Sequence, residues 1–252
     1  KDENETLFEI FARHGWRTEA VSAHWYFEMV PELKNGVHQW DNTGYQRVKP
    51  SLDQVTGPLV TAKLVNRLDA LAKHRQRFVL FAHYFDPHSH YVRHPGSPQF
   101  GSGTPLDRYD GEIAFTDAQL TPVLKRLDEP DFARNTIVVV TSDHGEAFDE
   151  HGYGLHGRTV YNEEIHVPLI IRLPGAVPAR IKEPVALVDI LPTLGTLTGV
   201  AMEKAQGERL VAHLIGQGAP PRKPIFSEQI PYPNYRTHMV AAFDRRRPIK
   251  AI

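Results

Sequence analysis

The segment from Ser142 to Glu146 combines residue types that bind metals and catalyse reactions. It has the sequence Ser-Asp-His-Gly-Glu and comes just after an apolar, β-branched run from Thr136 to Val140. Such a run predicts a strand covered on both faces, and the carboxyl ends of these strands are where open α/β sheets bind ligands. Asp143 and His144 pair a carboxylate oxygen with an imidazole nitrogen, two donors that suit a divalent cation. We therefore predict that Asp143 and His144 bind a divalent metal ion, and zinc, manganese and calcium are all compatible with this pair.

Simpler roles are open for the acidic residues of this region. An aspartate after a strand often caps a helix, and a lone loop histidine is usually solvated. Glu146 has three alternatives, because it can cap the backbone, orient the ring of His144, or have no role. Glu163 and Glu164 are predicted to be structural and to hold the loop that returns to the sheet. Arg158 is predicted to be solvated rather than to bind an anion.

The order of motifs around this segment resembles the alkaline-phosphatase/sulfatase superfamily. Its members carry a strand, Ser-Asp-His-Gly-Glu, a loop with His-Gly, a Tyr-Glu-Glu segment and Val-Pro-Leu-Ile-Ile. This chain matches that order at Ser142 to Glu146, His156-Gly157, Tyr161 to Glu164 and Val167 to Ile171. Further matches to segments of the superfamily are Gly15 to Thr18, Asp86 to His88 and Val185 to Leu194.

The resemblance implies a fold and a set of site residues. The fold is α/β, with a mixed, mostly parallel sheet flanked by helices, in one domain over residues 1–252. His88 and His156 stand at the positions that contact the sulfate or phosphate ester in the family. They are therefore predicted as catalytic residues that meet the charge of the transferring group. The alternative for each is a solvated loop histidine, and His90 and His151 are left undecided.

The resemblance also implies an activity for the protein that contains this chain. That activity is metal-dependent hydrolysis of a sulfate or phosphate ester through a covalent intermediate. The substrate is expected to be a small-molecule, lipid or glycan ester, and the location periplasmic or extracellular-facing. In the family the nucleophile is a Cys-derived formylglycine, Ser or Thr upstream of the Gly15 unit, and no such motif precedes Gly15 here. We therefore expect this chain to be an internal piece of the domain that is inactive by itself.

Two other functions are compatible with the same motifs. A phosphoethanolamine- or phosphoglycerol-type transferase shares Ser-Asp-His-Gly-Glu and a downstream Leu-His-Gly, which Leu155 to Gly157 also match. A non-catalytic member would keep the fold and lack the chemistry. The residue at the nucleophile position distinguishes the three, since Cys indicates a sulfatase, Thr favours a transferase and a non-nucleophile favours the non-catalytic member.

Composition excludes several other classes of function. Of the 252 residues 23% are charged, with a formal net charge of -1, so the chain lacks the excess of basic residues that nucleic-acid binding needs. The absence of cysteine excludes disulfides, Cys-ligated zinc and a Cys nucleophile within the chain. No apolar run reaches the ~20 residues of a membrane span. The polar start from Lys1 to Glu5 is unlike a signal peptide. The oligomeric state is left open.

The elements that position these residues follow from caps and periodicity. Residues 24–50 show no clear period and are expected to form an irregular loop on the substrate side, and residues 92–105 a surface loop. Pro122 predicts either a kinked helix or a second helix that Thr121 caps. The predicted helices cover Leu7 to Arg13 with Thr6 as cap, Ser51 or Asp53 to about Lys73, Asp107 to Asp128, a segment ending near Leu197, and Gly207 to Leu214. The predicted strands cover Thr18 to Ala23, Phe78 to His83, Thr136 to Val140, Val167 to Ile171, Pro224 to Glu228 and Met239 to Phe243.

Overall fold

A computed structural model describes residues 5–46, 55–217, 224–229 and 239–243 of the chain. It divides into two compact units, Lys1–Thr136 and Ile137–Ile252. The first unit has parallel strands and the second antiparallel strand pairs, each with helices beside them, and this confirms the predicted α/β fold class. The division into two compact units does not decide whether residues 1–252 form one domain, and the one-domain expectation stays a prediction.

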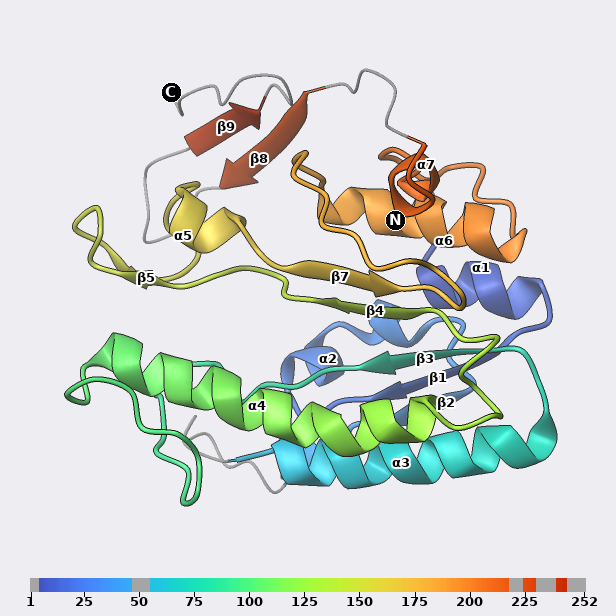
Figure 1. The fold of residues 1–252 in the computed structure, drawn as a ribbon, viewed down its shortest axis with the longest axis horizontal. Coiled ribbons are helices and arrows are strands. Elements are labelled where there is room, and N and C mark those ends of the chain that lie inside the picture. The colour runs from blue at the N-terminus through green and yellow to red at the C-terminus, as the bar shows by residue number, and fades with distance from the viewer. Residues whose placement is uncertain (1–4, 47–54, 218–223, 230–238, 244–252) are drawn as a thin grey trace. The chain divides into compact units, whose positions relative to one another are not determined.

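The first unit contains a three-stranded parallel sheet in the order β2-β1-β3 (Figure 1). Its strands are β1 (Arg17–Val21), β2 (Gln39–Asp41) and β3 (Phe78–Ala82). The central strand β1 is buried from Thr18 onward, as a strand with a neighbour on each side should be. Because parallel strands end at the same edge, the segments that begin at Ser22, Asn42 and His83 all lie at the carboxyl edge of this sheet.

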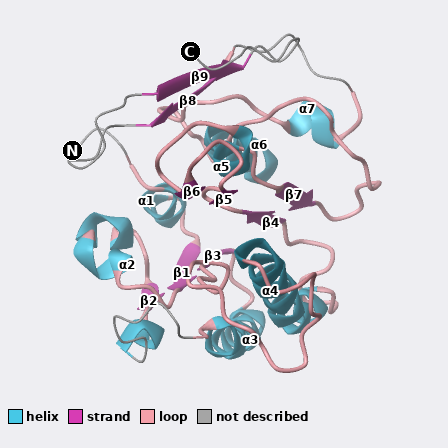
Figure 2. Cartoon of the chain, turned by 90° about the vertical axis from the view of Figure 1, so that its left-hand side faces the viewer, coloured by secondary structure: helices cyan, strands magenta, loops and turns pink. Residues whose placement is uncertain are grey.

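Helices cover both faces of this sheet. α3 packs on one face with α4 against it, and α1 lies on the opposite face (Figure 2). The Thr6 side chain accepts a hydrogen bond from the Glu9 backbone N–H and Glu9 reaches back to Thr6, which confirms the predicted cap. The helices of this unit are α1 (Leu7–Arg13), α2 (Tyr26–Met29), α3 (Gly57–His74) and α4 (Pro105–Leu127).

The prediction of an irregular loop over residues 24–50 is wrong for its described part. That part contains α2, β2 and two short 3-10 helices, Pro31–Lys34 and Thr43–Gln46. The strand β2 has only three residues, Gln39–Asp41, so no alternation of polar and apolar residues can show it. Backbone pairing with β1 defines β2, and this pairing is a tertiary effect that periodicity does not report.

The long helices also correct the predicted boundaries. Ser51 and Asp53, the predicted caps of α3, lie outside the described residues, and α3 begins after Thr56. α4 is a single helix that runs through Pro122, so the alternative of a second helix is wrong. The Thr121 hydroxyl donates back to the Asp117 carbonyl one turn earlier at 3.4 Å, which is the bond of a helix interior and not of a cap. The residues predicted on the inner face of α3 are all buried: Val60, Leu64, Leu68 and Leu71.

The second unit contains antiparallel strand pairs and short helices. β4 pairs with β7, so the strand before the Ser-Asp-His-Gly-Glu segment has an antiparallel neighbour. Asp189 is buried and accepts hydrogen bonds from the backbone N–H groups of Ala186 (2.9 Å) and Glu208 (2.7 Å), which joins two segments of this unit. The strands are β4 (Val138–Thr141), β5 (Ala147–Phe148), β6 (Gly154–Leu155), β7 (Leu169–Arg172), β8 (Ile225–Gln229) and β9 (Met239–Phe243). The α-helices are α5 (Asn162–Ile165), α6 (Ile190–Thr198) and α7 (Val211–Leu214).

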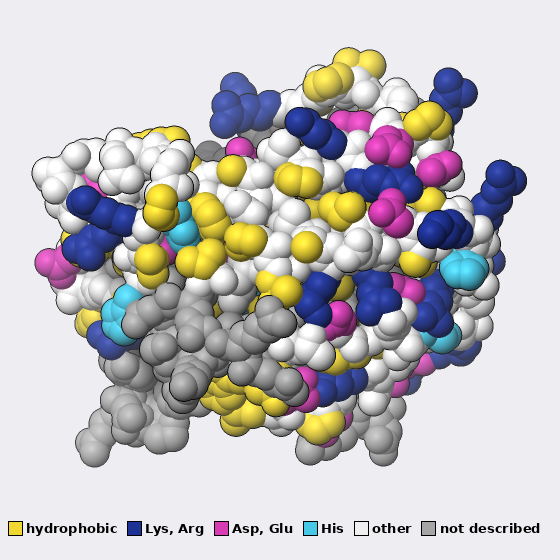
Figure 3. All heavy atoms as spheres, turned by 90° about the horizontal axis from the view of Figure 1, so that it is seen from below, with side chains coloured by type: hydrophobic (Ala, Val, Ile, Leu, Met, Phe, Trp, Pro, Cys, Tyr) yellow, Lys and Arg dark blue, Asp and Glu magenta, His cyan; other side chains and the backbone are white. Residues whose placement is uncertain are grey.

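The structure also shows the apolar length of the helices and the distribution of charge on one face. Within the described residues, no helix is both long and apolar enough to span a membrane. On the face drawn in Figure 3, Lys and Arg side chains are interspersed with Asp and Glu, in keeping with the net charge near zero.

Candidate active site

Short local hydrogen bonds hold the turn that carries Asp143 and His144. The Ser142 hydroxyl donates to the His144 carbonyl at 2.6 Å, and the His144 backbone N–H donates to Asp143 Oδ1 at 3.0 Å. The Gly145 backbone N–H then donates to the Glu164 carbonyl at 2.7 Å, which ties the turn to α5. A Cβ on residue 145 would lie 2.2 Å from the Glu163 carbonyl oxygen, so this approach requires glycine.

The side chains of Asp143 and His144 place two potential metal-binding atoms close together at the surface. Asp143 Oδ2 lies 3.6 Å from His144 Nε2, and the two side chains are 81% and 41% exposed. His144 Nδ1 lies 2.8 Å from the Gly145 carbonyl, which can only accept a hydrogen bond. The proton of the neutral ring therefore sits on Nδ1, and Nε2 presents its lone pair beside the carboxylate.

The Asp143 carboxylate oxygen and the His144 imidazole nitrogen can supply part of the ligand set of a divalent metal ion. A carboxylate oxygen and an imidazole nitrogen with its second nitrogen hydrogen-bonded are the usual ligand types of a divalent ion. Among the described residues, however, no group of three or more His, Asp or Glu side chains is arranged to hold a metal. Asp143 and His144 thus supply two ligands where a closed site commonly has four.

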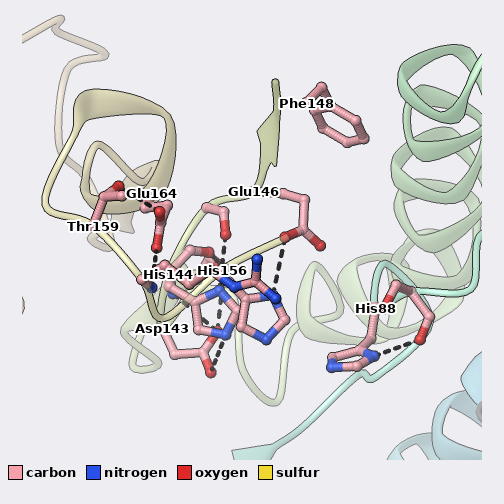
Figure 4. A network of polar contacts seen from close by, with 12 residues as sticks. His88, Asp143, His144, Glu146, Phe148, His156, Thr159 and Glu164 are labelled. Carbon is pink, nitrogen blue, oxygen red and sulfur yellow. Dashed lines mark hydrogen bonds and ion pairs between the residues drawn. The ribbon is translucent and has the colours of Figure 1, made fainter. Parts of the chain in front are cut away.

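His156 is held by Glu146, and the strand register explains how. β5 and β6 pair antiparallel with Ala147 opposite Leu155. Glu146 precedes β5 by one residue and His156 follows β6 by one residue, so the two are the next opposing pair. His156 Nδ1 lies 3.0 Å from Glu146 Oε1, and the Glu146 side chain is only 4% exposed (Figure 4). The structure thus gives Glu146 a role that the sequence did not predict, as the partner of His156.

The charge of Glu146 favours the protonated form of His156. The hydrogen bond from Glu146 is the main cause that raises the pKa of His156 above its usual value, and the charges of Glu146, Asp143 and Glu164 add to it against the opposing effect of burial. The His156 ring also stacks on His144, with centroids 4.0 Å apart and an angle of 27° (Figure 4). Asp143, His144 and His156 are therefore brought together in the second unit.

Side chains of the Tyr161 to Glu164 segment form hydrogen bonds that hold the loop before α5 in place. Glu164 is buried and accepts hydrogen bonds from the Thr159 hydroxyl and from the Arg158 backbone N–H at 3.2 Å. Glu163 Oε1 lies 2.5 Å from His151 Nδ1. Burial raises the pKa of Glu163, but the hydrogen bonds from its own backbone N–H and from His151 together lower it below its usual value. These contacts are those of structural residues, as predicted for Glu163 and Glu164, and they place His151 in the same scaffold.

His88 lies in the first unit, on a segment anchored to α3. The Asp86 carboxylate accepts hydrogen bonds from the Thr56 backbone N–H (3.0 Å) and hydroxyl (2.7 Å), so Asp86 binds the start of α3. The Phe85 ring stacks on His88 at 4.5 Å, and His88 Nδ1 lies 2.6 Å from the Ser89 carbonyl. The segment after β3 thus holds the His88 ring in one orientation.

His24 is a buried histidine near His88 that the sequence analysis does not single out. It follows β1 at the carboxyl edge of the parallel sheet and is 6% exposed. Burial is the main cause that lowers the pKa of His24 to about 4, and the charges of His83 and His88 lower it further. The rule that selected Asp143, a polar residue after a buried strand, applies equally to His24. The irregular loop predicted for residues 24–50 includes His24, and the prediction therefore gives this histidine no role.

The sequence is similar to that of sulfatases. The family model described as Sulfatase matches residues 1–200. Arylsulfatase K of Mus musculus is 38% identical over 96 residues, which is 37% of this chain and 17% of the relative. The chain therefore aligns with less than a fifth of that curated relative.

Solved structures show the same fold at low sequence identity. BT4656, solved in complex with its substrate D-glucosamine-2-N,6-O-disulfate, superposes with a TM-score of 0.72 at 17% identity, over 96% of this chain and 72% of that chain. The lipoteichoic acid synthase LtaP from Listeria monocytogenes superposes with a TM-score of 0.65 at 15% identity, over 96% and 66% of the two chains.

Proposed function

Because this chain belongs to the sulfatase family, we propose that the whole protein is a metal-dependent hydrolase of sulfate or phosphate esters that works through a covalent intermediate. One observation carries the proposal. In the second unit, the donor pair of Asp143 and His144 lies beside a histidine, His156, that a buried carboxylate holds in place. A metal-ligand pair beside a fixed hydrogen-bond donor is the arrangement that transfer of a sulfuryl or phosphoryl group requires.

Asp143 and His144 would hold the divalent ion through a carboxylate oxygen and Nε2. The bound ion would polarise an ester oxygen and stabilise the ionised form of a nucleophile. Zinc, manganese and calcium remain the candidates, since the two donors do not distinguish them.

His156 would act through its fixed imidazole. Its Nδ1–H donates to Glu146, so the opposite ring nitrogen, Nε2, is turned away from the buried carboxylate. From there the ring donates a hydrogen bond or a proton to an oxygen of the ester, where negative charge grows in the transition state. His88 is proposed to make a second contact of this kind, as the family resemblance implies.

The substrate class is proposed as a small-molecule, lipid or glycan ester. The sulfated glucosamine bound by BT4656 makes a sulfated sugar a useful first compound to test. A periplasmic or extracellular-facing location is proposed with the function, because the resemblance implies it.

The test uses the full-length protein that contains this chain, loaded with each candidate metal, on 4-nitrophenyl sulfate and 4-nitrophenyl phosphate. His156→Ala is expected to lower kcat by roughly a hundredfold or more while metal content stays constant. His151→Ala is the matched control, because this histidine belongs to the same hairpin and pairs with Glu163. Normal turnover by His156→Ala, or no turnover of any ester by the metal-loaded wild type, would contradict the proposal.

A transferase is the second candidate, supported by the Leu155-His156-Gly157 motif, whose middle residue is the proposed catalytic histidine. Product analysis separates the two functions. A hydrolase releases inorganic sulfate or phosphate into water, whereas a transferase moves a substituted phosphoryl group from a phospholipid to an acceptor and releases the lipid. A protein that binds these esters without either product would be the non-catalytic member.

A further inference from the structure

The loop between β3 and α4 lies beside the start of α4 (Figure 1) and is fastened to it on both sides of Arg93. Glu112 of α4 is buried and accepts a hydrogen bond from the Val92 backbone N–H at 2.6 Å. Its other carboxylate oxygen lies 2.7 Å from His94 Nε2, and the buried His94 ring stacks on Phe115 with centroids 3.6 Å apart. The two neighbours of Arg93 are therefore fixed, while Arg93 itself is exposed.

The guanidinium group of Arg93 reaches across the loop to Gly103. A Cβ on Gly103 would lie 2.4 Å from Arg93 Nη2, so this nitrogen lies against the glycine backbone. Arg108, which is also exposed, donates from Nε to the Gly103 carbonyl at 3.2 Å. Two guanidinium groups thus meet at one glycine, and both side chains line one pocket together with Ser97 and Phe100.

The positive charge of this pocket is only partly balanced. Within the part of the chain that the structure describes, neither Arg93 nor Arg108 forms an ion pair. Asp107 also lines the pocket, but its carboxylate accepts hydrogen bonds from the backbone N–H groups of Gly103 (2.9 Å) and Thr104 (2.8 Å), as part of the cap of α4. Like charges that converge repel each other, and a bound anion relieves this repulsion. Guanidinium groups suit an oxyanion in particular, because they can donate two parallel hydrogen bonds to it.

The same loop connects this pocket to the proposed site. Arg93 follows His88 by five residues, so their Cα atoms are at most about 18 Å apart. The segment is anchored at both ends, since Asp86 binds the start of α3 and Glu112 holds Val92 and His94. An ester group at His88 and a second anion at Arg93 are therefore at a fixed separation that one extended ligand, such as an oligosaccharide, can span.

We propose that Arg93 and Arg108 bind a second anionic group of the substrate, a sulfate, phosphate or carboxylate that is not the group transferred. The substrate is then a polyanionic ester, such as a multiply sulfated glycan. The inference rests on the proposed function, because it assigns the ligand of the pocket to the molecule whose ester group is transferred. The hydrogen bonds from Glu112 prepare the loop for this contact, so less order has to be gained on binding.

Calorimetry on the full-length protein with a heparin tetrasaccharide as the polyanionic probe tests the pocket. Arg93→Gln and Arg108→Gln are each expected to weaken binding by roughly fivefold or more at an unchanged Tm, because each removes a charged donor. Arg93→Lys keeps the charge and loses the planar fork, so its affinity should lie between those of Arg93→Gln and wild type.

Arg134→Gln is the matched control, because Arg134 is an exposed arginine of the same unit outside this pocket. It should leave the affinity unchanged. No binding by wild type, unchanged binding by Arg93→Gln, or an equal loss in Arg134→Gln would overturn the inference.

A local readout separates this inference from the proposed function. The Nε–H resonance of Arg93, assigned by its absence from the spectrum of Arg93→Gln, should move to saturation as the tetrasaccharide is added. If it moves and no ester is hydrolysed, the anion pocket stands and the proposed function fails. If esters are hydrolysed and the resonance stays fixed, the inference fails. In a protein that hydrolyses esters, the tetrasaccharide should also compete with 4-nitrophenyl sulfate, and binding at Arg93 without competition would show that the anion is not part of the substrate.

Discussion

Glu146 and His156 are ten residues apart and form a carboxylate–imidazole pair with 3.0 Å between Oε1 and Nδ1. The pairing is a product of the β5–β6 hairpin, whose register makes these two residues opposite neighbours. Because the Glu146 side chain is buried, its charge acts on His156 with little screening by solvent. The pair therefore controls both the orientation and the protonation of the proposed catalytic histidine.

The first prediction concerns this pair. Glu146→Gln keeps the shape of the side chain and removes its charge, so the pKa of His156, which the pair raises, should fall toward its usual value. NMR titration of His156 in metal-free protein measures this directly. Glu150→Gln is the matched control, because Glu150 lies in the same hairpin and accepts its hydrogen bond from the Phe148 backbone N–H. An unchanged titration of His156 in Glu146→Gln would show that the carboxylate does not control it.

The second prediction concerns the metal ligands. In the full-length protein, Asp143→Asn combined with His144→Ala should abolish the bound divalent metal while the fold stays intact, because both donors of this unit are removed together. Elemental analysis and circular dichroism check the two parts. Asp149→Asn is the control substitution, since Asp149 is exposed in the same loop system and its φ of 79° is a conformation that asparagine tolerates. Metal content equal to wild type in the double variant would remove Asp143 and His144 from the metal site.

The third prediction is an acid sensitivity caused by His24. Its folded pKa of about 4 lies below the 6.5 of an ordinary histidine, so the unfolded chain binds this proton more readily than the folded chain. The contribution of His24 to stability is complete above pH 6.5 and is lost as pH falls from 6.5 to 4. His24→Gln lacks this titration, so urea unfolding should show less loss of stability over that interval in the variant than in wild type. Parallel curves for the two proteins would be the contrary result.

Parts of this fold could be predicted because local chemistry determines them. The helix from Leu7 to Arg13 carries its own capping box, and the inner face of α3 repeats with the helical period, so neither depends on distant residues. The strand before Ser142 is visible because its residues are apolar in succession. The segment with Asp143 and His144 was recognised for the same reason, since a buried strand ends directly before it.

Other parts depend on tertiary pairing and were therefore missed. The three residues of β2 gain strand geometry from β1, and the role of Asp86 at the start of α3 needs a contact across thirty positions of sequence. The partner of Glu146 follows from the register of a two-residue strand pair, which no propensity predicts. The catalytic roles of His88 and His156 stay predictions, since the geometry supports them without testing them.

The last prediction concerns Gly145, the backbone contact on which the proposed site depends. A Cβ at this position would lie 2.2 Å from the Glu163 carbonyl oxygen, which belongs to the backbone and cannot rotate away. Gly145→Ala should therefore push the turn away from α5 and cost about 1–3 kcal/mol of unfolding free energy, the usual cost of overpacking. The matched control is Gly154→Ala in the same loop system, because a Cβ there meets nothing closer than the Ala147 carbonyl oxygen at 3.9 Å. Urea unfolding compares the stabilities, and metal content should fall in Gly145→Ala alone, because the turn that moves carries both Asp143 and His144. Equal stability and equal metal content in the two variants would show that the close approach of Gly145 to α5 does not hold the metal-binding turn in place.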